Sequence, residues 1–155
     1  MSVISLEVDL PAFERDVRTF VEGVQRGLAD VAHEAALDGA ETARTVGRFQ
    51  DRTGELRGSI RVLSRVRTAE GGEARFGTRV RHGLFVEAGT RPHEIRARRA
   101  SALRWEQDGE IRFARLVHHP GGRAFPFMGP GAIRAEASLY ARAQVLVARE
   151  IARAG

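Results

Sequence analysis

The stretch 9-DLPAFERDVRTFVEGVQRGLADVAHEAALDGAETARTVG-47 decides the fold of this 155-residue chain. One apolar stripe runs along it at helical steps of three and four residues: Phe13, Val17, Phe20, Val24, Leu28, Val31 and Ala35. Asp9 offers an N-cap oxygen and Pro11 suits a first turn, so the pattern predicts one helix from about residue 11 to the high forties. Its interior glycines each weaken a helix by ~1 kcal/mol relative to alanine. The helix therefore needs a partner surface along its length.

The rest of the chain alternates between strand and turn signals before a second helix. A strand is predicted at 3–8, a hairpin at 60–80, and a tight turn at Asp108-Gly109 between Leu103/Trp105 and Ile111/Phe113. Residues 82–90 fit either a helical turn or a strand end. The second helix, at about 130–153, has a spine at helical spacing: Ile133, Ala137, Tyr140, Gln144, Val147 and Ile151. This order predicts a single α+β domain over 1–155, with both helices packed on an antiparallel sheet.

Composition narrows the classes of function. The chain has no cysteine, which excludes disulfides, thiolate metal sites and cysteine nucleophiles. The net charge is +5 and every basic residue outside the histidines is arginine, a composition that suits protein interfaces and nucleic acid alike. A GC-rich genome accounts for the arginines equally well. Neither a secretory signal nor an apolar run of membrane-spanning length is visible, so we expect a soluble protein of the cytoplasm or of an assembly built there.

Residues 116–131, LVHHPGGRAFPFMGPG, raise the question of catalysis. His93, His118 and His119 converge if their strands pair, but adjacent strand residues point to opposite faces, which separates His118 from His119. The metal-ligand spacings, nucleophile elbows and phosphate loops known from enzymes are missing from the sequence. We therefore expect no enzyme activity, no metal and no cofactor, and structural or interfacial histidines.

Two further features each allow two interpretations. Glu87 lies in an apolar patch and is either a perturbed carboxylate or the ion-pair partner of an arginine such as Arg91 or Arg123. The arginine-dense run 91–104 fits a phosphate backbone, although Glu94, Glu106 and the acids at 108 and 110 interrupt its positive field. A solvated or subunit-facing strand explains the run better than a nucleic-acid footprint does.

An interaction surface explains residues 116–131 better than a catalytic site does. Phe125, Pro126, Phe127 and Met128 form an apolar segment with few backbone donors. Proline restricts such a segment before binding, and aromatic and methionine side chains are enriched in interface cores. The segment is therefore predicted to anchor a neighbouring subunit.

Three motifs, in order, resemble one known family. They are RTGELRGSI at 52–60, HGLFVEAGTRPHEI at 82–95 and VHHPGGRAFPFMGPG at 117–131. The chain resembles the head–tail joining, or tail-completion, proteins of long-tailed bacteriophages and prophages, a minor tail component family typified by the gene-ten product of a lambdoid phage. The matching residues are Thr53, Gly54, Leu56, Ser59, Ile60, Phe85, Val86, Glu87, Gly89, Thr90, His119, Pro120, Gly121, Pro126, Phe127, Met128 and Pro130. Phe85 lies near the position where a tyrosine-alanine pair is common in that family. Gly131 stands between Pro130 and Ala132, where alanine usually follows the proline directly, which implies a shifted start of the last helix.

The resemblance implies a non-enzymatic virion protein at the phage neck. It would complete the tail and join head to tail as a homo-oligomeric ring, expected to be hexameric, with the adaptor or stopper on one side and the tail terminator or tail tube on the other. DNA would pass through the lumen without sequence-specific binding, and no membrane would be involved. Such a ring needs two different complementary faces on each subunit. The alternative is a basic DNA-binding accessory protein of the same packaging and neck module.

Overall fold

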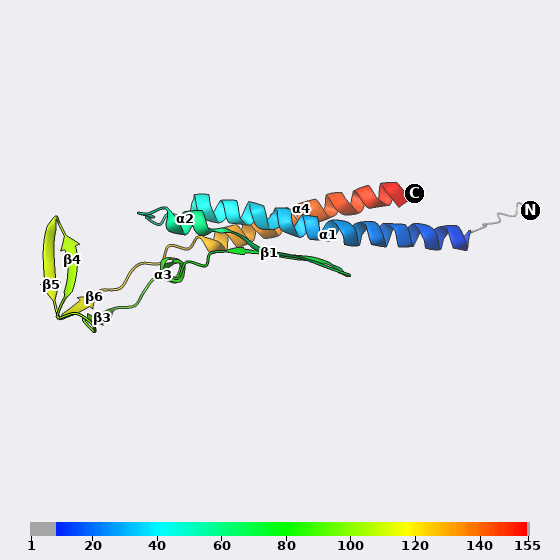
Figure 1. Cartoon of the computed structure of the whole chain (residues 1–155). Coiled ribbons are helices and arrows are strands. Elements are labelled where there is room, and N and C mark those ends of the chain that lie inside the picture. The colour runs from blue at the N-terminus through cyan, green and yellow to red at the C-terminus, as the bar shows by residue number, and fades with distance from the viewer. Residues whose placement is uncertain (1–8, 155) are drawn as a thin grey trace, which may run out of the picture.

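Two long helices form the body of the molecule. The structure is a computed structural model and describes residues 9–154. Helix α1 (Leu10–Val46) and helix α4 (Met128–Ala154) lie antiparallel and side by side (Figure 1). The Asp9 carboxylate accepts a hydrogen bond of 3.0 Å from the Ala12 amide and caps α1. The long first helix predicted from the sequence is confirmed, while the strand predicted at 3–8 lies outside the described residues.

Small residues bring α1 close to its partners. The residues that α1 buries are all glycine or alanine: Gly23, Ala29, Ala35, Ala36, Gly39, Ala40 and Ala43. A Cβ on Gly27 would lie 2.4 Å from the side chain of Leu146, and one on Gly39 would lie 2.9 Å from the Gly131 carbonyl oxygen. The interior glycines thus weaken the isolated helix and permit the packing of α4. The partner surface that the sequence required is α4.

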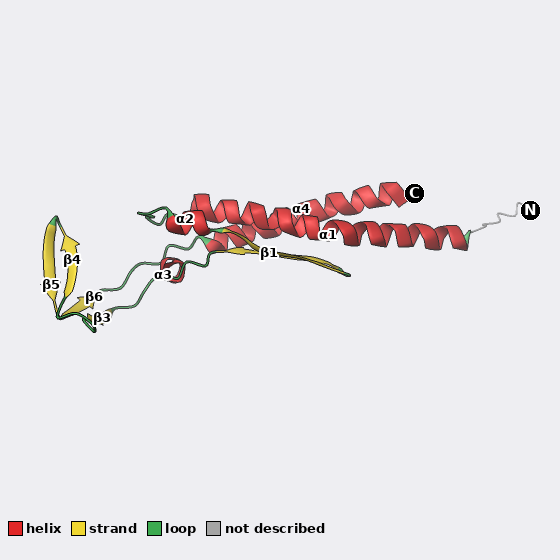
Figure 2. Cartoon of the chain, viewed as in Figure 1, coloured by secondary structure: helices red, strands yellow, loops and turns green. Residues whose placement is uncertain are grey.

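The first hairpin lies along α1. Strand β1 (Arg61–Thr68) pairs antiparallel with β2 (Gly71–Gly77), which confirms the hairpin predicted at 60–80 (Figure 2). Gly72 rests on the backbone of Ala29, where an added Cβ would come within 2.3 Å of the Ala29 Cα. Arg65 and Arg67 both pair with Asp30 of α1. Contact between the hairpin and α1 is therefore both steric and electrostatic.

Two short helices flank this hairpin. Helix α2 (Glu55–Ser59) begins after Gly54, whose φ is +73°. Ser59 ends α2, where its hydroxyl donates to the Leu56 carbonyl at 2.7 Å. Helix α3 (His82–Ala88) resolves the ambiguity at 82–90 in favour of helix.

The remaining strands form a projecting arm. Strand β3 (His93–Arg96) pairs with β6 (Leu116–His119), and β4 (Leu103–Gln107) pairs with β5 (Glu110–Ala114). Asp108 and Gly109, with φ of +54° and +78°, make the predicted tight turn. We call residues 91–121 the β arm; it lies at the end of the molecule away from the start of α1 (Figure 1).

The strands make three separate two-stranded sheets rather than one. Of the described strands, only those of the β1–β2 sheet pack substantially on a long helix, α1, because the chain leaves the body at residue 90 and returns at 122. The α+β class with antiparallel pairing is as expected.

Helix α4 uses a different face from the one its sequence suggested. Its predicted spine at 133, 137, 140, 144, 147 and 151 is exposed throughout. The face on α1 instead buries Gly131, Ser138, Leu146 and Glu150. The glycine-rich seam of α1 accommodates small and paired polar groups at close range, and Leu146 fits into the space beside Gly27.

Polar side chains hold the two helices together. The Ser138 hydroxyl donates to Asp38 at 2.5 Å, and Arg142 donates to both Ser138 and Asp38 at 3.0 and 3.1 Å. The hydrogen bond from Ser138, more than the nearby guanidinium of Arg142, lowers the pKa of Asp38 below its ordinary value, against the opposing effect of burial. Glu150 is buried near Gly23 and pairs with Arg149 at 2.9 Å. No helix within 9–154 carries an apolar stretch that could cross a membrane.

Candidate functional site

The three sequence motifs meet in one place, at the base of the β arm. Leu56 and Ile60 from the first motif and Phe127 from the third belong to the main buried cluster, which Phe49 and two alanines of α1 complete. Val86 from the second motif packs against the same cluster. The Phe49 and Phe127 rings lie 5.0 Å apart in a tilted arrangement. The motifs thus share a structural role as the junction between body and arm.

Burial separates Phe127 from the rest of the segment that was predicted to anchor a neighbouring subunit. Phe127 is only 1% exposed, so its side chain is part of the core and cannot itself insert into a neighbour. Phe125 and Pro126 are exposed, and Met128 is half-buried. The Arg123 guanidinium lies over the Phe125 ring at 5.9 Å. Phe127 is buried because it directly precedes α4, which begins at Met128. At this position the chain turns inward beneath α1 and α2.

Glu87 caps α4. Its Oε2 accepts hydrogen bonds from the backbone amides of Phe127, at 2.7 Å, and Met128, at 3.0 Å. These are orphan amides of a helix N-terminus, where a carboxylate also complements the helix dipole. Glu87 therefore pairs with backbone amides and not with Arg91 or Arg123, the ion-pair partners suggested by the sequence. Sequence alone could not find this one, because donor and acceptor are 40 and 41 residues apart.

The base of the arm is fixed by backbone geometry. Thr90 and Gly122 exchange hydrogen bonds of 2.9 and 3.0 Å, and the Phe125 amide donates to the Val86 carbonyl at 2.8 Å. Gly89 and Gly121 have φ of +72° and +90°, and a Cβ on either would approach the opposite backbone to 2.6 or 2.4 Å. The motif glycines are therefore required by both conformation and space.

The histidines flank this base on opposite faces. His93 and His119 are cross-strand partners with ring centroids 5.0 Å apart, and the Gly121 amide donates to Nδ1 of His119 at 3.0 Å. His118 points to the other face, 3.6 Å from Glu94. The separation predicted for His118 and His119 is confirmed. Over the described residues, no group of three or more histidine, cysteine or acidic side chains is placed to hold a metal ion.

The first motif is organised by its polar residues and by an arginine that the sequence did not single out. The Thr53 hydroxyl accepts from the Glu55 amide at 3.3 Å, and the Ser59 and Thr78 hydroxyls are 2.6 Å apart. Arg57 lies 4.3 Å over the Phe49 ring and donates to the carbonyls of Gly47 and Phe49, at 2.5 and 3.1 Å, and to that of Arg44. Arg57 thereby satisfies carbonyls at the end of α1.

An open, largely apolar cleft of about 710 Å³ adjoins the junction. Its walls come from the hairpin, α3 and the start of α4, and include Leu63, Phe76, Val80, Phe85, Phe127 and Met128. Phe85 is exposed at its rim, whereas Phe127 is covered. Pro130 follows in the first turn of α4, and Pro120 is exposed at the arm. The motifs therefore build a surface that can receive an apolar group rather than one that inserts.

Comparisons with models of protein families, with curated proteins and with solved structures find no match to this chain. The likeness to head–tail joining proteins rests on the three motifs.

Proposed function

We propose that this chain is a structural virion protein of the phage neck, which completes the tail and mediates head–tail joining as a subunit of a ring. The observation that carries the proposal is the unusually large surface of the single chain. It exposes 12032 Å², whereas a compact monomer of its 17.0 kDa mass exposes roughly 7,700 Å². A protein built to be covered by neighbours has this property.

The exposed surface is apolar in continuous stretches. On α4, Ile133, Tyr140 and Ile151 lie along the face that points away from α1, and Ile133 is 71% exposed. The cleft beside Phe85 is a second such surface, built by the hairpin, α3 and the start of α4. Two different surfaces on one subunit are what a closed ring of identical, head-to-tail contacts requires. The adaptor or stopper and the tail terminator or tail tube are the proposed neighbours above and below.

The test uses the phage or prophage that carries the gene. A stop codon early in the gene should yield filled heads and separate tails in electron micrographs, and the wild-type gene supplied in trans should restore joined particles. Tyr140→Asp supplied in trans should restore fewer joined particles than wild type, because it places a charge on an exposed apolar face without disturbing the core. Normal infectious particles from the stop-codon phage would contradict the proposal.

The DNA-binding alternative predicts a different property of the purified chain, an affinity for duplex DNA. Its phosphate contacts would release counterions, so duplex affinity would fall steeply as salt rises. Seven arginines and four carboxylates give the β arm a net charge of +3, which makes the arm the region to test. A duplex affinity that depends steeply on salt, and that is lost when arginines of the β arm are replaced by glutamate, would favour that alternative over the structural role.

A further inference from the structure

The β4–β5 ribbon of the arm has apolar side chains on both faces and no covering element. Cross-strand partners share a face, so Phe113 and Ile111 lie on one side with Arg104 and Glu106, while Leu103 and Trp105 lie on the other. Phe113 is 65% exposed and Ile111 52%. Within 9–154, no other helix or strand packs substantially on β4 or β5. A lone two-stranded ribbon is only marginally stable in water. We therefore expect another surface to pack on the Phe113 face.

The first turns of α1 present a surface of matching kind. Helix α1 extends beyond the end of α4 (Figure 1), and its uncovered part exposes an apolar stripe at helical spacing: Leu10, Phe13, Val17 and Val21. Phe13 is 61% exposed. Glu14 falls on the same helical face and has no ion-pair partner among the described side chains. We call these five residues the α1 stripe.

Charge selects the α1 stripe over the exposed face of α4. The turns of α1 that carry the stripe, residues 10–22, hold three carboxylates and two arginines, a net charge of −1, against the +3 of the β arm. Helix α4 carries four arginines and two carboxylates, a net charge of +2, and would repel the arm. In the arm, Arg104 stands directly opposite Phe113 and makes no ion pair with a described carboxylate. Apolar contact and electrostatics therefore favour the same acceptor.

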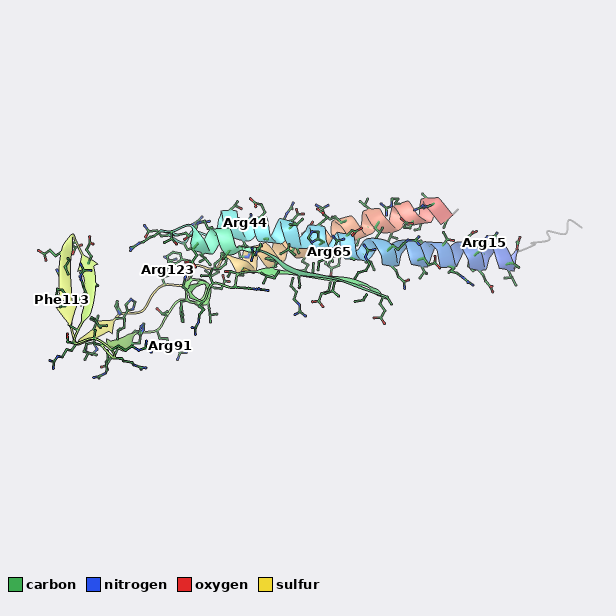
Figure 3. The ribbon with its side chains drawn as sticks, in the orientation of Figure 1. Arg15, Arg44, Arg65, Arg91, Phe113 and Arg123 are labelled. Atoms are coloured by element: carbon green, nitrogen blue, oxygen red, sulfur yellow. The ribbon has the colours of Figure 1, made fainter. Side chains whose placement is uncertain are left out.

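We propose that the β4–β5 ribbon docks, through its Phe113 face, on the α1 stripe of a second copy of this chain. The contact joins different copies because the labelled side chains Phe113 and Arg15 lie at opposite ends of the molecule (Figure 3). The surface in excess of a compact monomer exceeds the roughly 800 Å² per partner that a standard interface covers. The inference rests on the self-assembly part of the proposed function and adds one specific contact between copies to the two surfaces described there.

Disulfide trapping tests the contact directly, because the 155-residue chain has no cysteine of its own. A tagged Phe113→Cys chain is mixed with an untagged Val17→Cys chain under mild oxidation, and the mixed dimer is quantified on a non-reducing gel. The matched control pairs Phe113→Cys with Ile133→Cys, which is a more exposed position on α4. We expect the stripe pair to give at least roughly tenfold more mixed dimer than the control pair, a difference of about 1.4 kcal/mol in effective affinity. Equal yields, or no mixed dimer, would overturn the proposal.

A charge exchange provides the second measurement. Arg104→Glu and Glu14→Arg each place like charges in the proposed contact, so each should weaken self-association in sedimentation velocity at low salt by roughly tenfold. The two variants mixed with each other should associate again. Circular dichroism of each variant checks that the helices are retained. A full-length chain that stays monomeric at all concentrations, or charge variants that associate like wild type, would count against the docking.

The two proposals fail separately. Loss of trapping with head–tail joining still dependent on the gene would remove the arm contact and leave the neck role standing. Efficient trapping in a phage that joins heads to tails without this gene would do the reverse.

Discussion

Phe127 carries more of the core than any other side chain in the motifs. It is the largest of the fully buried side chains and contacts both Phe49 and the end of α1. Phe127→Ala should lower the free energy of unfolding by about 3–5 kcal/mol, since a large cavity would remain. Phe125→Ala, two positions away and 38% exposed, should change it by less than about 1 kcal/mol. Urea denaturation of both variants decides the matter, and equal losses would contradict the assignment of Phe127 to the core.

Asp38 gives the helix pair a defined response to acid. Because its pKa lies below the ordinary 3.8 in the folded chain, the carboxylate stabilises the fold at neutral pH. That contribution is fully present above about pH 4 and is lost as the pH falls through the lowered pKa. Asp38→Asn should therefore be less stable than wild type at pH 7, and the difference should shrink below pH 3.8. Thermal melts across pH measure this, with Glu41→Gln on the exposed side of α1 as the control; a pH-independent difference would refute the role of ionisation.

At the scale of elements, the sequence pattern predicted an element correctly wherever that element depends on residues close to it in sequence. The long first helix, the Asp108-Gly109 turn and the 60–80 hairpin depend on neighbours in sequence, and all three are present. The packing face of α4 depends on the shape of α1, about which the α4 sequence says nothing. Its apolar spine predicted the wrong side, since the residues of that spine are exposed in the chain. The Glu87 cap was missed for a related reason, since it joins distant segments.

Adjacent residues on α4 separate the two faces. Leu146 is 4% exposed and fills the space beside Gly27, whereas Val145 is 69% exposed. Leu146→Ala should destabilise the chain by about 2–5 kcal/mol, and Val145→Ala should leave stability within about 0.5 kcal/mol of wild type. Chemical denaturation of the pair is the measurement. A larger loss of stability from Val145→Ala would indicate that α4 packs through the face predicted from the sequence.

The seating of the hairpin on α1 depends on Gly72. Gly72→Ala would push β2 off the Ala29 backbone, which cannot yield as a flexible side chain can. We expect a marked fall in melting temperature and faster hydrogen exchange in both β1 and β2. Gly58→Ala is the matched control, because a Cβ there meets nothing within 4 Å and alanine favours helix α2. A Gly72→Ala chain as stable as the Gly58→Ala chain would show that the hairpin contributes little.

For the whole molecule, the exposed arm predicts where a protease will cut. Arg98 and Arg99 lie in the exposed bend between β3 and β4, outside any helix. Limited trypsin digestion of the dilute chain should nick this bend first and leave the helical body intact, as mass spectrometry of the fragments would reveal. At concentrations where copies associate, cleavage at the same bond should slow. Primary cleavage inside α1 or α4 would mean that the helix pair is the less stable part.

The pairing of α1 with α4 also sets the order in which the chain can fold. Asp38 and Ser138 are joined across 100 residues of sequence, so α1 leaves the ribosome long before its helical partner exists. During that interval the β1–β2 hairpin, which closes the shorter loop, is the first element able to shelter the helix. At synthesis rates of about 5–20 residues per second, α1 waits seconds for α4. A nascent chain therefore exposes its glycine-rich seam for that time, so we expect α1 to pack fully only once α4 has been synthesised.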